Sequence, residues 1–71
     1  MESPLGFTIY PYSSRNGETV AWNAVIYDLR NPQEVNGMKQ YRFVKLVPAR
    51  GSPEAVHSLA SQMIHDMLAP H

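Results

Sequence analysis

The spacing of the hydrophobic residues changes once along this chain, and the change divides it into a strand-forming part and a helix-forming part. Up to residue 47, apolar side chains tend to recur at every second position, which is typical of strands. From Ser52 onward they recur at every third and fourth position, which is typical of a helix that covers an apolar surface. The pattern predicts one α+β domain over residues 1–71, in which a three-stranded antiparallel β-meander packs against one C-terminal α-helix (βββα).

Three strands and one helix are predicted, separated by segments rich in turn-forming residues. Asn16-Gly17 predicts a tight hairpin turn, because both positions would adopt positive φ. The stretch Arg30–Gly37 contains Asn31-Pro32 and Asn36-Gly37 and predicts a loop of about eight residues. The predicted strands span Leu5–Tyr12, Thr19–Leu29 and Met38–Val47, and the predicted helix spans Pro53–Leu68.

A turn at Asn16-Gly17 sets the register of the first two strands. It places Arg15 opposite Glu18 and Pro11 opposite Trp22. Proline has no N–H to donate to the ladder, so we expect a wider or bulged loop that keeps the same facing. The register also pairs Ile9 with Ala24 and Phe7 with Ile26, on the face that collects the apolar residues.

The third predicted strand can present either set of alternating residues to the helix. Burial of Arg42 without a partner would be costly, so we expect Tyr41 and Phe43 to face the core instead. On the helix, Ser52 is the expected N-cap residue and Pro53 the first helical residue. The predicted core comprises Phe7, Ile9, Trp22, Ile26 and Phe43 from the sheet, and Val56, Leu59, Ala60, Met63 and Met67 from the helix.

The small size and the amino-acid composition restrict how such a domain can be stabilised. The chain has 71 residues and no cysteine, so neither disulfides nor cysteine-based zinc sites are expected. A domain of this size buries only about 60% of the surface that its unfolded chain exposes. We therefore expect apolar packing to be supplemented by a protein partner or by self-association.

Three histidines are the residues that invite a metal or catalytic interpretation. His57 and His65 lie eight residues apart on one helix face, whereas a shared metal needs a spacing of three or four, and position 61 is Ser. His65 precedes Asp66 directly, and adjacent helical side chains point in different directions. No catalytic serine motif, glycine-rich phosphate loop or pair of carboxylates is present, so we expect no enzyme activity, no cofactor and no metal.

The face of the sheet that the helix leaves uncovered is the most informative surface. By alternation it carries Thr8, Tyr10, Tyr12, Asn23, Val25, Tyr27, Arg42, Val44 and Leu46. Tyrosines, aliphatic residues and one arginine form a composition typical of protein interfaces, although a semi-apolar face that is merely tolerated is the simpler interpretation. The sequence favours a protein-interaction module, either a homodimer or a small phage or accessory protein that binds a host partner. The predicted partner-binding residues are Tyr10, Tyr12, Val25, Tyr27, Arg42, Val44 and Leu46.

A nucleic-acid-binding alternative follows from the same architecture. A three-stranded sheet with Arg42 on its open face resembles, in outline, the AP2 and phage-integrase arm-binding domains, which place such a sheet in the major groove of DNA. Those domains carry several basic residues on the sheet, whereas Lys39 and Lys45 alternate here to the opposite side from Arg42. The chain has six Lys and Arg against six Asp and Glu, so the net charge of zero disfavours nucleic acid.

Two further features concern the location of the protein and its relatives. The N-terminal residues lack a charged segment followed by an apolar one, and no apolar run is long enough to cross a membrane, so we expect a cytoplasmic protein. The segments GFTIYP (6–11), WNAVI (22–26) and SPEAVHSLASQMIHDML (52–68) resemble a group of small uncharacterised bacterial proteins with the pattern YxGYxIxP, WxAxVxI and an EEA helix. This resemblance implies the βββα fold and no assigned biochemistry. The chain departs from the pattern in lacking the basic tail and the glycine of the last helix.

Overall fold

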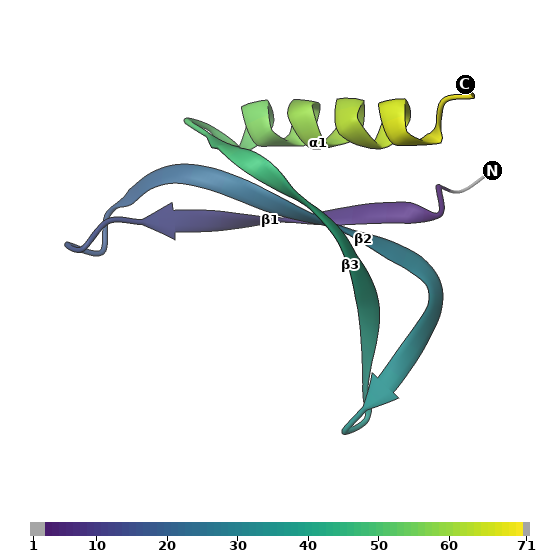
Figure 1. Cartoon of the computed structure of the whole chain (residues 1–71). Coiled ribbons are helices and arrows are strands. Elements are labelled where there is room, and N and C mark those ends of the chain that lie inside the picture. The colour runs from purple at the N-terminus through teal and green to yellow at the C-terminus, as the bar shows by residue number, and fades with distance from the viewer. Residues whose placement is uncertain (1–2, 71) are drawn as a thin grey trace.

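The computed structural model, which describes residues 3–70, confirms the βββα fold. The strands form one antiparallel sheet in the order β1-β2-β3, and the helix lies on one side of it (Figure 1). Strand β1 spans Leu5–Ser13, β2 spans Thr19–Val35, β3 spans Met38–Arg50 and the helix α1 spans Pro53–Leu68. Within residues 3–70 no helix combines the length and the apolar character needed to cross a membrane.

Strands β2 and β3 continue well beyond the part of the sheet that the helix covers. Strand β1 pairs with β2 from Leu5, opposite Asp28, so residues 29–41 form a two-stranded arm without β1 and without the helix. We call the rest of the sheet, together with α1, the body. Figure 1 shows that the arm bends away to the side of the sheet opposite the helix. The molecule consequently measures 39 × 37 × 17 Å.

The arm replaces the loop predicted for Arg30–Gly37, and that prediction is wrong. Asn36 and Gly37 have φ values of 53° and 78° and form the tight turn between the paired residues Val35 and Met38. The register shifts between Asp28 and Gln33, where Asn31 takes a φ of 55°. Pro32 is tolerated here because β2 has no β1 partner along the arm, so its missing N–H breaks no ladder bond on that side.

The first hairpin has the predicted register and a different turn. Pro11 lies opposite Trp22, as predicted, and a shift between Tyr12 and Ser13 supplies the expected bulge. The facing of Phe7 to Ile26 and of Ile9 to Ala24 is also confirmed.

At the tip of this hairpin, Gly17 has a φ of 80°, whereas Asn16 does not have a positive φ. The Gly17 amide donates to the Ser14 carbonyl at 3.0 Å, and the Ser14 amide donates to the Glu18 carbonyl at 2.8 Å. These two bonds close a three-residue loop in which the glycine forms a bulge. The predicted pair of positive-φ residues, and with it the pairing of Arg15 with Glu18, is therefore wrong.

The facing predicted for Tyr41 and Phe43 in β3 is also wrong, because the strand contains an extra residue. Ile26 lies opposite Lys45, and the next residue of β2, Tyr27, lies opposite Phe43, which leaves Val44 without a partner. This bulge reverses the alternation on one side of Val44. Phe43 is consequently 61% exposed instead of contributing to the core, and Tyr41 is exposed with it.

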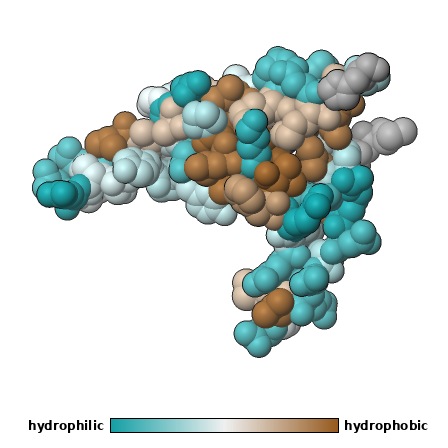
Figure 2. Space-filling model, in the orientation of Figure 1, coloured by the Kyte–Doolittle hydropathy of each residue, from teal (hydrophilic) through white to brown (hydrophobic). Residues whose placement is uncertain are grey.

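The core lies between the body of the sheet and α1, where Figure 2 shows apolar residues gathered, whereas the arm is mostly hydrophilic. Ser52 caps the helix as predicted, since its side chain accepts a hydrogen bond of 3.1 Å from the Ala55 amide. Of the predicted core residues, Met67 is exposed as well as Phe43. The buried apolar residues are Leu5, Ala24, Ile26, Val47, Val56 and Ala60, and those packed around them are Phe7, Ile9, Trp22, Val44, Leu59, Met63 and Ile64.

We expect Ile26→Ala and Phe43→Ala to differ strongly in their effect on stability. Ile26 is fully buried, and its truncation leaves a cavity, so the free energy of unfolding should fall by about 2–5 kcal/mol. Phe43 is largely exposed, and its truncation should change the value by no more than about 0.5 kcal/mol in the monomer. Urea titrations of both variants at low protein concentration measure the difference. A larger loss for Phe43→Ala would show that this ring belongs to the core.

Candidate functional site

The open face of the body, together with the adjoining residue Tyr41 of the arm, carries a row of aromatic and aliphatic side chains that we call the aromatic face. The register brings its members together across all three strands, since Thr8 lies opposite Val25, Val25 opposite Leu46, and Tyr27 opposite Phe43. Five of the seven predicted binding residues lie here. The aromatic face comprises Tyr10, Tyr12, Val25, Tyr27, Tyr41, Phe43 and Leu46.

Tyr27 holds a central position in this face and is fixed from several sides. Its hydroxyl lies 2.9 Å from Thr8 Oγ1, and its ring stacks on that of Tyr41 with centroids 5.5 Å apart. Gly6 lies opposite it on β1, where a Cβ atom would stand 3.3 Å from Tyr27 Cε2. The missing side chain at position 6 therefore leaves room for the Tyr27 ring beside the sheet.

The other members of the face carry no formal charge, and all of them except the half-buried Val25 are exposed to solvent. Tyr10, Tyr12 and Leu46 are about half exposed, at 49%, 58% and 54%. The paired positions on this side of the body include no Lys, Arg, Asp or Glu. Uncharged, half-exposed aromatic side chains on a rigid sheet can lose their water to another apolar surface at little cost in conformational entropy.

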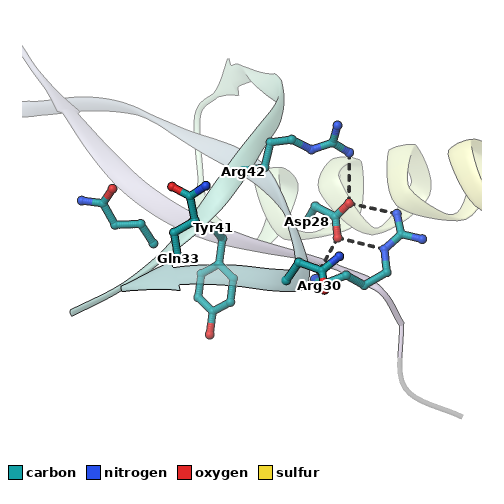
Figure 3. Close-up of a pocket in the computed structure, with 7 residues that line it drawn as sticks. Asp28, Arg30, Gln33, Tyr41 and Arg42 are labelled. Atoms are coloured by element: carbon teal, nitrogen blue, oxygen red, sulfur yellow. Dashed lines mark hydrogen bonds and ion pairs between the residues drawn. The ribbon is translucent and has the colours of Figure 1, made fainter. Parts of the chain in front are cut away.

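Arg42 and Val44 do not lie on the aromatic face, and their predicted placement there is wrong. Val44 is the extra residue of the β3 bulge and packs against the core. Arg42 lies opposite Asp28, and its Nη2 donates to Asp28 Oδ2 at 3.0 Å (Figure 3). Placing Arg42 on the helix side of the sheet does not leave its charge unpaired, because the register puts the Asp28 carboxylate opposite it.

Asp28 forms the centre of a charged cluster where the arm leaves the body. Its Oδ1 accepts hydrogen bonds from the Arg30 backbone amide and from Arg30 Nε at 2.8 and 3.0 Å, and its Oδ2 accepts one from Arg30 Nη2 at 2.9 Å. Figure 3 shows Arg30 and Arg42 converging on this carboxylate while Tyr41 points away. A hollow of 610 Å³ beside the cluster is lined by Asp28, Arg30, Asn31, Gln33, Gln40, Tyr41 and Arg42.

The cluster keeps Asp28 ionised. Hydrogen bonds from the Arg30 guanidinium, and to a smaller extent from the Arg30 amide, hold the pKa of the Asp28 carboxyl well below its ordinary value of 3.8. Burial raises this pKa, and the hydrogen bond from Arg42 lowers it further. Asp28 is buried, whereas the side chains of Arg30 and Arg42 are mostly exposed. The bonds from residues on both sides of the bend join the arm to the body, so we assign the cluster a structural role.

His57 and His65 lie on α1, whereas His71 lies outside the described residues. The His57 ring meets Phe7 edge to face, with centroids 5.2 Å apart, so it contacts the sheet in addition to solvent. His65 Nδ1 lies 3.7 Å from Asp66 Oδ1, beyond hydrogen-bonding distance, and the Asp66 carboxylate accepts a bond from Gln62 instead. Within residues 3–70, no group of three His, Cys, Asp or Glu side chains could hold a metal ion.

Sequence reasoning missed Tyr41 and Phe43 as members of the face, and Asp28 as the partner of Arg42. Strict alternation along β3 gave the wrong side, and no local signal marks the bulge at Val44. One available signal was Asp28 itself. It alternates to the same side as Ile26, and a buried carboxylate there requires a cationic partner from a neighbouring strand.

Comparison with known proteins returned no matching family model, no matching curated protein and no matching solved structure.

Removal of the Asp28 charge should change how stability depends on pH. A carboxyl group whose pKa is lowered on folding contributes stability that is complete above its unfolded-state pKa and is lost as the pH falls toward the folded-state value. The stability difference between the wild type and Asp28→Asn should therefore be largest at neutral pH and shrink below about pH 4. Urea unfolding of both proteins from neutral to acidic pH measures it, and a difference that is constant over this range would contradict the assigned ion pairs.

Proposed function

We propose that this protein is a protein-interaction module that binds its partner through the aromatic face. The observation that carries the proposal is the gathering of four tyrosines, one phenylalanine, a valine and a leucine on one uncharged side of the sheet. Monomeric proteins rarely expose contiguous apolar patches of this kind, and larger ones mark sites of association.

The rigidity of the face supports the same function. Tyrosine and phenylalanine supply a large contact area with few rotatable bonds, so little entropy is lost when they are covered. Tyr27 is already held by Thr8 and Tyr41 before any partner arrives. The tyrosine hydroxyl groups can donate and accept hydrogen bonds at the border of an otherwise apolar contact. These features are those of the residues that dominate binding energy at protein interfaces.

The nucleic-acid alternative lacks a basic residue at the required place. Arg42 donates to Asp28 on the other side of the sheet, and the paired positions of the aromatic face include no lysine or arginine. Binding to phosphates requires cationic side chains on the contacting surface. Protein is therefore the class of partner that we propose.

Photocrosslinking from the face tests the proposal directly. Phe43 is replaced with p-benzoylphenylalanine, and a matched control carries the same group at Leu68, which is 46% exposed at the end of α1. After irradiation in extract of the native host, position 43 should give crosslinked protein adducts that position 68 does not give. Equal labelling from the two positions, or adducts of position 43 with nucleic acid alone, would contradict a protein-binding face.

A further inference from the structure

The protein exposes more surface than a compact monomer of its mass. For 8.0 kDa, the scaling of folded monomers gives about 4,450 Å², whereas this molecule exposes 5571 Å², an excess of about 1,100 Å². The radius of gyration is also larger than that of a compact domain, since it is 13.9 Å against about 11 Å for 71 residues. The excess is comparable to the roughly 800 Å² that each partner contributes to an interface of standard size.

The chemistry of the aromatic face favours a second copy of this chain over a charged partner. In a two-fold symmetric contact each residue meets the same surface on the other copy, so a face with one sign of charge would repel itself. The paired positions of this face include no Lys, Arg, Asp or Glu. Tyrosine hydroxyl groups both donate and accept hydrogen bonds, which makes the face complementary to itself.

The shape of the molecule places the aromatic face where a second copy can cover it. The arm bends toward the side of the sheet opposite the helix, which is the side of the aromatic face (Figure 1). The arm carries the exposed apolar residues Val35 and Met38 near its tip, and it has no β1 or helix to support it. Two-stranded ribbons are marginally stable on their own in water, so a copy packed between arm and body would stabilise both.

We propose that the aromatic face is the two-fold interface of a homodimer, a proposal that rests on the protein-binding function proposed above. The area is sufficient for this. Tyr10, Tyr12, Tyr41 and Phe43 are 41–61% exposed. A fully exposed aromatic side chain can bury about 150–250 Å², so these four, about half exposed, can bury roughly 300–500 Å² on each copy and roughly 600–1,000 Å² on the two copies together. That is about half of a standard interface, and the remainder falls to the aliphatic residues and the arm. Val25 and Leu46 lie opposite each other in the middle of the face, and the proposed dimer places them near its two-fold axis.

Sedimentation equilibrium of the purified protein tests the dimer. From about 1 µM to about 1 mM, the mass should rise from 8.0 kDa toward twice that value. Leu46→Glu places one carboxylate from each copy near the axis and should weaken association at least about 30-fold, as at an interface hot spot. Leu68→Glu alters an equally apolar and comparably exposed residue on α1, and it should leave the association constant unchanged.

Two controls separate a loss of association from a loss of folding. Circular dichroism and Trp22 fluorescence show whether each variant is folded. If Leu46→Glu does not fold, the Phe43→p-benzoylphenylalanine protein is used in its place. Irradiated alone, that protein should form a covalent dimer. A wild type that stays monomeric up to about 1 mM overturns the dimer. So does a dimer that Leu46→Glu and Leu68→Glu leave equally stable. If the wild type stays monomeric but position 43 still crosslinks to another protein in extract, the dimer is overturned and the protein-binding function stands. If the wild type stays monomeric and position 43 gives no protein adducts, both the dimer and the protein-binding function are overturned.

Discussion

One extra residue in β3 decides which side chains this small sheet offers to solvent. Val44 has no partner in the register, and as a result Arg42 lies beside Asp28 while Tyr41 and Phe43 lie beside Tyr27. Both groupings bring together side chains that attract each other. Arg42 adds a second guanidinium to the buried carboxylate that Arg30 already contacts, and the aromatic rings meet another ring. The bulge thus exchanges charged for aromatic residues on the open face, and the interface proposed for that face depends on the exchange.

Much of the fold was predictable because it follows from local signals. Ser52 and Pro53 fix the start of α1, and the alternation of β1 and β2 fixes their register from Phe7 to Pro11. The errors share a different cause. Asn31 and Pro32 disrupt a strand in most settings, yet here they lie where β2 has no β1 neighbour, which local sequence does not reveal. The bulge at Val44 likewise depends on a contact between β2 and β3, so strict alternation predicts the open-face position of Leu46 and places Tyr41 and Phe43 wrongly in the core.

The cluster around Asp28 and the aromatic face are two sides of the same bend. On one side, Arg30 and Arg42 hold the Asp28 carboxylate and join the arm to the body. On the other side, Tyr27 and Tyr41 stack across the same pair of strands. The bend spreads the molecule out and leaves a core of only six buried apolar residues among those that the structure describes. A domain of this size has little stability to spare, so a second copy on the open face would offset the cost of that shape.

Cross-strand nuclear Overhauser contacts between β2 and β3 test the bulge most directly. With Val44 unpaired, backbone protons of Asp28 should lie close to those of Arg42, and ring protons of Tyr27 close to those of Tyr41. In a ladder without the bulge, Tyr27 would lie opposite Val44 and Asp28 opposite Phe43. Contacts between Asp28 and Phe43, together with contacts from the Phe43 ring to α1, would contradict the bulge and place the aromatic residues of β3 in the core.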